Sequence, residues 1–173
     1  MLNTQLLGKL CLFPAVCLGV ACADPASDDT EQTTDHVMST LDRAVDYQNG
    51  DFVLLNEQAI PSVAVAGAEV RVWVSRGAVD EYRTVKQKSG VQALPEGAAI
   101  VREVFRNGAL EKLTLLAKGP PGTNPELGDL WFAVVDKDGN ILPDKAGAPQ
   151  VGNLAECVAC HKTRVNNAFL FGI

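Results

Sequence analysis

The sequence predicts an α+β domain built on a mostly antiparallel β-sheet of about five strands, with a helix at each end. Three observations predict this fold. The valine-rich segment 69–75 alternates apolar and polar residues, as a half-buried strand does. Asn107-Gly108 separates the apolar segments 98–106 and 109–117, and this pair is typical of a type I′ hairpin because both positions need positive φ. Apolar residues recur at helical spacing over 35–48.

Composition and charge narrow the class of protein. The chain has 173 residues, of which 47% are hydrophobic, as in one packed globular domain. The first 23 residues carry a single charge, on Lys9, which leaves 14 basic against 21 acidic residues in the remainder. So acidic a chain argues against nucleic acid or an anionic membrane as a partner. It fits a protein that meets small-molecule ligands or a basic redox partner protein.

The N-terminus has the pattern of an export signal. Lys9 precedes an apolar run over 10–21 that is too short to span a bilayer, and Ala21-Cys22-Ala23 resembles a cleavage site. We expect a signal peptide over residues 1–23 and a periplasmic or otherwise exported protein. Cys22 leaves an alternative, because a cysteine here also resembles a lipoprotein box and would anchor the protein to a membrane. Cleavage after Ala23 is the favoured interpretation.

The first half of the mature chain contains a polar segment and two predicted helices. Residues 24–35 are acidic and are predicted to form a flexible leader. The helix over 35–48 follows and opens a single domain assigned to residues 36–173. The segment 51–67 is apolar but interrupted by proline and glycine, and no element is predicted there. A short helix is expected over 78–88.

The second half contains mostly strands and turns. Residues 95–97, Pro-Glu-Gly, predict a turn before the hairpin. The segment 119–128 holds three prolines and is expected to form a surface loop. Residues 130–135 (LWFAVV) predict a buried strand, and a turn then leads to a short strand at 141–142. Asn153 is a candidate N-cap for a last helix.

Two cysteines in that last helix indicate the chemistry. The sequence Cys-Val-Ala-Cys-His runs from Cys157 through Cys160 to His161, and residues 23–156 contain no cysteine. Two thiols three residues apart can form thioethers with both vinyl groups of a haem, and the adjacent histidine can then reach the iron. The motif predicts a C-terminal haem-bearing helix. It would hold one covalent haem c per chain through Cys157 and Cys160, with His161 as the proximal iron ligand.

Other uses of a Cys-x-x-Cys pair have less support. A zinc site would need two more soft ligands, and the mature chain outside the motif offers only His36. A thioredoxin-like dithiol would need a βαβ setting, which the hairpin signal contradicts. A lone disulfide is the remaining alternative.

The sixth iron ligand decides which function such a haem would serve. A low-spin electron carrier usually has methionine or histidine there. Met38 falls among the apolar positions of the first helix, where core packing explains it, and His36 is expected to be solvated at the start of that helix. Lys86 and Lys88 are expected to be exposed helix charges. Scarcity of ligands favours an open or weakly filled position that binds or transforms small molecules. The alternative is an electron-transfer cytochrome with Met38 or a lysine as sixth ligand.

The order of these segments resembles the cytochrome P-460 family over roughly residues 50–173. The matching segments are 69–74 (EVRVWV), the turn 95–97, 99–104 (AIVREV), 131–136 (WFAVVD), 155–162 (AECVACHK), Phe169 and Phe171. The resemblance implies a mainly antiparallel sheet with a C-terminal haem helix, often assembled as a homodimer, and an iron without a strong distal protein ligand. It also implies chemistry on small nitrogen oxides, since members oxidise hydroxylamine and related proteins bind nitric oxide and carbon monoxide.

One position departs from the pattern of that family. The hydroxylamine-oxidising members have a lysine, cross-linked to the porphyrin, where this chain has Arg102. Arginine stays protonated and is a poor nucleophile, so no cross-link is expected. Whether the protein is an oxidoreductase is therefore left open by the resemblance.

Arg102 and the adjacent Glu103 are the candidate catalytic residues. Strand alternation puts Arg102 on one face with Ile100 and Val104, and Glu103 on the other. If the first face covers the haem, Arg102 holds a fixed cation beside bound nitrite, nitric oxide or peroxide. The alternative is a surface arginine paired with a neighbouring carboxylate.

Overall fold

The computed structural model describes residues 28–85 and 93–173. The predicted signal peptide with Cys22 lies outside these residues, as do Lys86, Lys88 and the predicted end of the second helix. In the described ranges, no helix is both long enough and apolar enough to cross a membrane.

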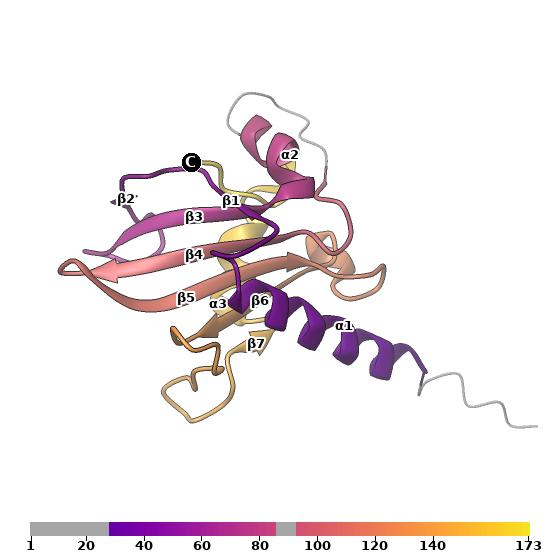
Figure 1. The fold of residues 1–173 in the computed structure, drawn as a ribbon. Helices are drawn as coiled ribbons and strands as arrows, with labels where there is room; N and C mark the ends of the chain where they lie inside the picture. Colours follow the sequence, from indigo (N-terminus) through magenta and orange to yellow (C-terminus); the bar gives the residue numbers. More distant parts are fainter. Residues whose placement is uncertain (1–27, 86–92) are drawn as a thin grey trace, which may run out of the picture.

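A seven-stranded antiparallel sheet forms the centre of the fold (Figure 1). Its strands pair in the order β1, β3, β4, β5, β6, β7, and β2 pairs with the first residues of β3. The strands are β1 (Phe52–Leu54), β2 (Ile60–Pro61), β3 (Glu69–Ser75), β4 (Ala99–Arg106), β5 (Ala109–Lys118), β6 (Leu130–Val135) and β7 (Val151–Gly152). The predicted α+β class with a mostly antiparallel sheet is confirmed. Four of the predicted strands are present as β3, β4, β5 and β6, and β1, β2 and β7 are additional strands of only two or three residues.

Helices flank the sheet on both faces (Figure 1). The α-helices are α1 (Asp28–Val45), α2 (Val79–Thr84) and α3 (Ala155–Lys162). Three short 3₁₀ helices accompany them: η1 (Arg76–Ala78), η2 (Pro125–Leu127) and η3 (Val165–Asn167). The cysteines of the motif therefore lie on α3, in the last helical segment that the sequence predicts.

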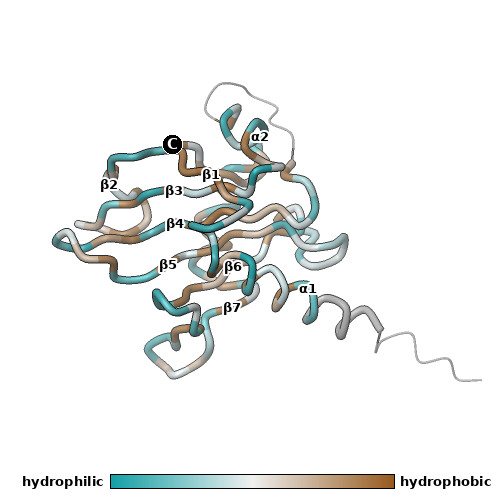
Figure 2. The backbone as a smooth tube through the Cα atoms, viewed as in Figure 1, coloured by the Kyte–Doolittle hydropathy of each residue, from teal (hydrophilic) through white to brown (hydrophobic). Residues whose placement is uncertain are grey.

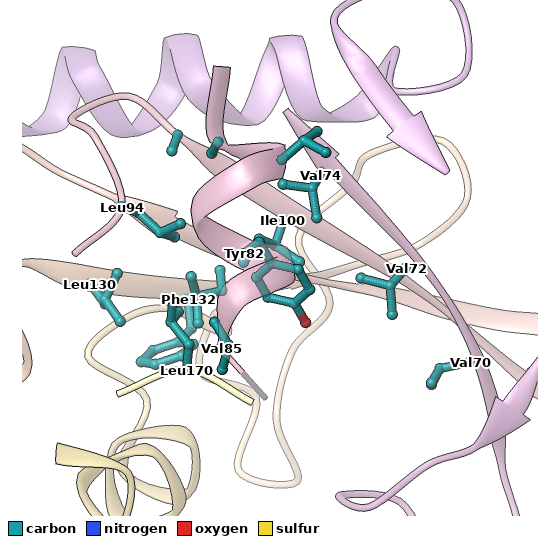
Figure 3. Packing of buried hydrophobic residues seen from close by; sticks show 14 of the residues in the cluster. Val70, Val72, Val74, Tyr82, Val85, Leu94, Ile100, Leu130, Phe132 and Leu170 are labelled. Carbon is teal, nitrogen blue, oxygen red and sulfur yellow. The ribbon is translucent and has the colours of Figure 1, made fainter. Parts of the chain in front are cut away.

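Each face of the sheet carries its own apolar core. On the first face, α1 packs through Leu41 and Ala44 against Val101, Leu115 and Trp131. On the second face, side chains of the strands pack with α2 and the C-terminal segment (Figure 3). This second core includes Val70, Val72, Val74, Tyr82, Ile100, Phe132 and Leu170. Cys157 and Val158 of α3 pack against it, so α1 and α3 lie on opposite faces.

The β4–β5 hairpin confirms the predicted turn. Asn107 and Gly108 have φ of 51° and 78°, as a type I′ turn requires. The turn is hydrophilic, whereas apolar segments lie along the strands nearer the middle of the sheet (Figure 2). The local sequence therefore sets both the turn and the antiparallel pairing of its strands.

A β-bulge then changes which residues of this hairpin share a face. The register shifts between Val104 and Phe105, so that Val104 pairs with Lys112 and Arg102 pairs with Thr114. Residues directly opposite each other project from the same face. Lys112 and Thr114 therefore share the second face with Arg102.

The N-terminal helix begins earlier than predicted. It starts at Asp28 rather than near residue 35, so most of the segment predicted as a flexible leader is helical. The apolar periodicity that predicted the helix begins only at Val37. The helix therefore extends beyond the segment that apolar periodicity identified.

Two predictions near the C-terminus also differ from the structure. Leu154, not Asn153, occupies the N-cap position of α3, and no side chain caps the helix. In place of a strand at 141–142, Ile141 forms an isolated bridge to Val135. The proline that follows Leu142 has no N–H to donate, which keeps the ladder from continuing.

A glycine after β6 lets the end of α1 approach the sheet. Gly139 has φ of +86°, and a Cβ atom built there would lie 2.4 Å from Cγ2 of Val45. We expect Gly139→Ala to lower the free energy of unfolding by about 2–4 kcal/mol, because a positive-φ penalty adds to an overpacked contact. Urea unfolding of the variant measures this loss.

Gly147→Ala is the matched control for that variant. Gly147 has a similar φ of +88°, but no atom lies within 4 Å of its Cβ position. It should lose only about 1–2 kcal/mol, the cost of the backbone conformation. Equal losses in the two variants would contradict the close approach of α1.

Candidate functional site

A cavity of about 350 Å³ lies between α3 and the second face of the sheet. Cys157, Cys160 and His161 line it from α3, and Arg102 lines it from β4. Its apolar lining includes Ile100, Leu116, Phe132 and Leu170. The Cys-x-x-Cys-His motif and the strand face that holds Arg102 thus meet in one cavity.

The two thiols are free in this structure. Cys157 is half-buried and Cys160 is exposed, and they lie one turn apart on α3. Burial raises the pKa of the Cys157 thiol, and the nearby Glu156 carboxylate and Cys160 raise it further, while Arg102 opposes them. A redox dithiol needs a lowered pKa in its attacking cysteine. The surroundings of Cys157 therefore argue against a thioredoxin-like function.

A backbone carbonyl fixes the orientation of the His161 ring. Nδ1 of His161 lies 2.6 Å from the carbonyl oxygen of Phe169, so Nδ1 carries the proton and donates it. This leaves Nε2 as the nitrogen with a free lone pair. Burial lowers the pKa of His161, the hydrogen bond to Phe169 opposes this, and the charge of Arg102 lowers the pKa further, so the surroundings favour the neutral ring. A neutral imidazole with one free nitrogen is the form that binds a metal.

Aromatic rings and strained backbone hold this arrangement. Phe132 and Phe171 lie against the His161 ring, with centroids at 4.9 Å and 5.1 Å. Ala168 and Phe169 both have positive φ, 49° and 61°, which is uncommon for residues with a side chain. This backbone conformation turns the chain back toward α3 and presents the Phe169 carbonyl to His161.

The C-terminal segment is tied to the body of the domain beside the cavity. The Tyr82 hydroxyl of α2 donates to the Phe171 carbonyl at 2.6 Å. Arg102 Nη2 reaches the same oxygen at 3.4 Å, and the side chain of Leu170 is buried in the second core. These contacts hold the segment that orients His161.

Arg102 lies in the cavity, and no described carboxylate pairs with it. Its side chain is half-buried, and within the described ranges no Asp or Glu oxygen lies within ion-pair distance of it. The predicted alternative, a surface arginine paired with a neighbouring carboxylate, does not match this setting. The charge of Arg102 acts on both Cys157 and His161.

Glu103 lies on the opposite face of the sheet, away from the cavity. Only 1% of it is exposed, and its carboxylate forms an ion pair with Arg71 at 2.7 Å. It also accepts hydrogen bonds from Tyr47 at 2.8 Å, Trp73 at 3.1 Å and Gln48 at 3.2 Å. Glu103 thus joins β3 and β4 to the segment after α1, and it is a structural residue rather than a group at the site.

The cavity floor is the part of the cavity lining that belongs to the sheet, opposite α3. Two of its residues were not singled out from the sequence. Lys112 and Thr114 of β5 line the cavity beside Arg102. Alternation along 109–117 shows that they share a face with each other, but not whether this is the face of Arg102. Only the bulge decides that point.

The residues proposed as a sixth ligand from the first helix lie elsewhere. Met38 is 49% exposed, so the expectation that it packs in the core is wrong, and it belongs to α1, which packs on the first face of the sheet. His36 is on the same helix. Neither side chain shares the cavity with His161.

One imidazole and two thiols form a donor set that suits a haem. A porphyrin brings four nitrogen ligands for its iron, so the protein need add only an axial imidazole and, for covalent attachment, two thiols. Among the residues that the structure describes, no group of three or more His, Cys, Asp or Glu is placed to hold a bare metal ion. The residues of this cavity fit haem c better than zinc.

A scan of protein-family models and searches of curated proteins and of solved structures find no match to this chain. The resemblance to the cytochrome P-460 family therefore stays a prediction from the ordered segments. The motif and the cavity are the features of the chain that bear on its function.

Proposed function

We propose that this protein is an exported monohaem c-type cytochrome that binds small nitrogen oxides, such as hydroxylamine and nitric oxide, or performs redox chemistry on them. The haem would be joined to Cys157 and Cys160 by thioethers, with His161 as its proximal ligand. One observation carries this proposal. Both thiols and an imidazole whose Nδ1 is already engaged line a single cavity together with an arginine.

The residues of the chain would have separate tasks around such a group. When bound, the haem supplies a redox-active iron with an exchangeable coordination position. The Phe169 carbonyl holds the His161 ring in one orientation and makes its Nε2 a more basic ligand for a metal. Apolar side chains such as Ile100 and Leu116 exclude water from the cavity. An iron whose sixth coordination position can be exchanged is suited to ligand binding or catalysis rather than to simple electron transfer.

Arg102 distinguishes this site from one with a lysine at the same position. A guanidinium that has no carboxylate partner within the described residues can stabilise negative charge on a bound nitrogen oxide. It stays protonated and is not expected to form a bond to the porphyrin. Support for hydroxylamine oxidation is accordingly weaker than support for binding nitric oxide or nitrite.

A low-spin electron carrier is the second candidate, and one observation favours it. Lys112 lines the cavity and is a possible sixth ligand of the lysine type. Met38, on the opposite face of the sheet, gives no support to the methionine version. The two candidates differ in whether the distal position is open.

Absorption spectra of the oxidised and reduced protein separate these candidates. Protein from a host that matures c-type cytochromes is expected to give a high-spin ferric spectrum and to take up nitric oxide and cyanide rapidly. The reason is that, among the residues that the structure describes, no methionine or second histidine lines the cavity. Met38→Leu is the control, since this exposed side chain should leave the spectrum unchanged.

One spectral result would contradict the proposal, and a second would contradict the inference from Arg102. A low-spin ferric spectrum that becomes high-spin on Lys112→Gln would instead establish the electron carrier. A strongly red-shifted ferrous Soret band would reveal a porphyrin cross-link and overturn the inference from Arg102.

A further inference from the structure

Two basic side chains lie on neighbouring strands at the floor of the cavity. Arg102 of β4 pairs with Thr114 of β5, and Lys112 lies two residues from Thr114, so all three project from one face. Arg102 and Lys112 are diagonal cross-strand neighbours, whose Cα atoms are typically about 7–8 Å apart. All three residues line the cavity. At this spacing, two long cationic side chains can contact one small anion between them.

The bulge in the hairpin is what brings Lys112 to this face. The turn pairs Arg106 with Ala109, and a regular ladder from that pair would set Arg102 opposite Leu113. Lys112 would then face α1. The observed shift between Val104 and Phe105 reverses this and turns Lys112 toward the cavity. Bulges often occur beside functional sites because they redirect a side chain.

Nearby carboxylates do not neutralise the two cations. Glu103 is on the other face and pairs with Arg71. Glu111 is next to Lys112 in sequence but pairs with Arg106 at 2.7 Å. Glu156 of α3 lines the same cavity but is exposed, and within the described residues it forms no ion pair with either cation. Like charges on one face of a half-buried site repel each other, and a bound anion would relieve that repulsion.

We propose that Arg102, Lys112 and Thr114 form an oxyanion-binding site at the floor of this cavity. The guanidinium and the ammonium supply positive charge and N–H donors, and the Thr114 hydroxyl supplies a further donor. The inference rests on the proposed function, because the anion has two possible sources: a haem propionate, or a soluble nitrogen oxoanion such as nitrite. A propionate there anchors the haem, whereas nitrite there is a ligand or substrate.

Nitrite is the probe for the soluble source, and titration calorimetry measures its affinity. Arg102→Gln and Lys112→Gln are each expected to weaken binding to the haem-loaded protein at least tenfold, as loss of a charge-assisted hydrogen bond does. Lys145→Gln is the matched control. It removes the same charge from an exposed position between β6 and β7, so it should change the affinity by less than about twofold.

A redox titration tests the other source. If a propionate occupies the site, nitrite affinity is the same in all variants and the midpoint potential reports the site instead. The midpoint potential is expected to depend on pH where the propionate takes up its proton. In the double variant Arg102→Gln/Lys112→Gln this pH range moves upward by at least about one unit, because a carboxylate without cationic partners takes up its proton at higher pH. Lys145→Gln shows no such movement. Either result, loss of nitrite affinity or this movement, supports the oxyanion site and identifies its occupant.

Other results would overturn the inference. One is that Arg102→Gln and Lys112→Gln match Lys145→Gln in both measurements. Another is a low-spin spectrum that Lys112→Gln converts to high-spin, which would assign Lys112 to the iron. The haem content of the wild type is measured first and tests the proposed function by itself. If the wild type is colourless, nitrite titration of the same variants still tests the oxyanion site.

Discussion

Replacing Cys157 and Cys160 together by alanine is expected to abolish covalent haem attachment. Each thiol would form one thioether, and residues 23–156 offer no substitute cysteine. Both thiols line the cavity that His161 also lines, so the double variant removes the links while the imidazole stays. Haem absorbance that remains with the polypeptide after denaturing electrophoresis should fall from one haem per chain to background.

Ala159→Ser is the matched control for the cysteine variant. Ala159 lies between the two cysteines on α3 and is exposed, so the change alters the motif without touching a thiol or His161. The control should keep a full complement of haem. Covalent haem in the double alanine variant would show that the thiols are not the attachment points.

Glu103→Ala is expected to lower the stability of the protein strongly, although Glu103 lies on the face of the sheet opposite the cavity. The change leaves Arg71 without its ion pair and deprives Tyr47 and Trp73 of a hydrogen-bond acceptor. Burial raises the pKa of Tyr47, and the hydrogen bond to Glu103 raises it further, so Tyr47 keeps the proton that it donates. We expect the free energy of unfolding to fall by about 3 kcal/mol. This is the low end for a broken buried pair, because the Arg71 side chain is 32% exposed.

Glu111→Ala provides the comparison for that loss. Glu111 pairs with Arg106 at the same 2.7 Å, but both side chains are exposed. Such a surface pair contributes little to stability, because water and salt screen both charges. Urea unfolding should therefore separate the two variants clearly, and equal losses would contradict the structural role of Glu103. Haem content should be unchanged in Glu103→Ala, because Glu103 faces α1 rather than the cavity.

The strands with strong local patterns were predictable from the sequence. Alternation over 69–75, the apolar run over 130–135 and the Asn107-Gly108 turn locate β3, β6 and the β4–β5 hairpin to within a residue. These signals are local, since they depend on side-chain periodicity and on the φ that a turn requires. The motif on α3 is local for the same reason, and its three residues line one cavity as the spacing implied.

The parts of the site that escaped prediction depend on non-local geometry. The bulge between Val104 and Phe105 determines that Lys112 projects from the same face as Arg102, and no residue type in the hairpin predicts this bulge. The contact that orients His161 comes from the backbone of Phe169, in a conformation that its sequence does not indicate. Every residue has a backbone carbonyl, so the sequence does not show which one contacts His161.

The state of the two thiols in the purified wild-type protein is the most direct test of haem attachment on α3. The protein is made in a host that matures c-type cytochromes, denatured, extracted with acidified acetone and treated with iodoacetamide. We expect the haem absorbance to stay with the polypeptide and neither Cys157 nor Cys160 to be alkylated, because thioethers survive extraction and block both sulfurs. A colourless polypeptide with both cysteines alkylated would contradict the proposed function.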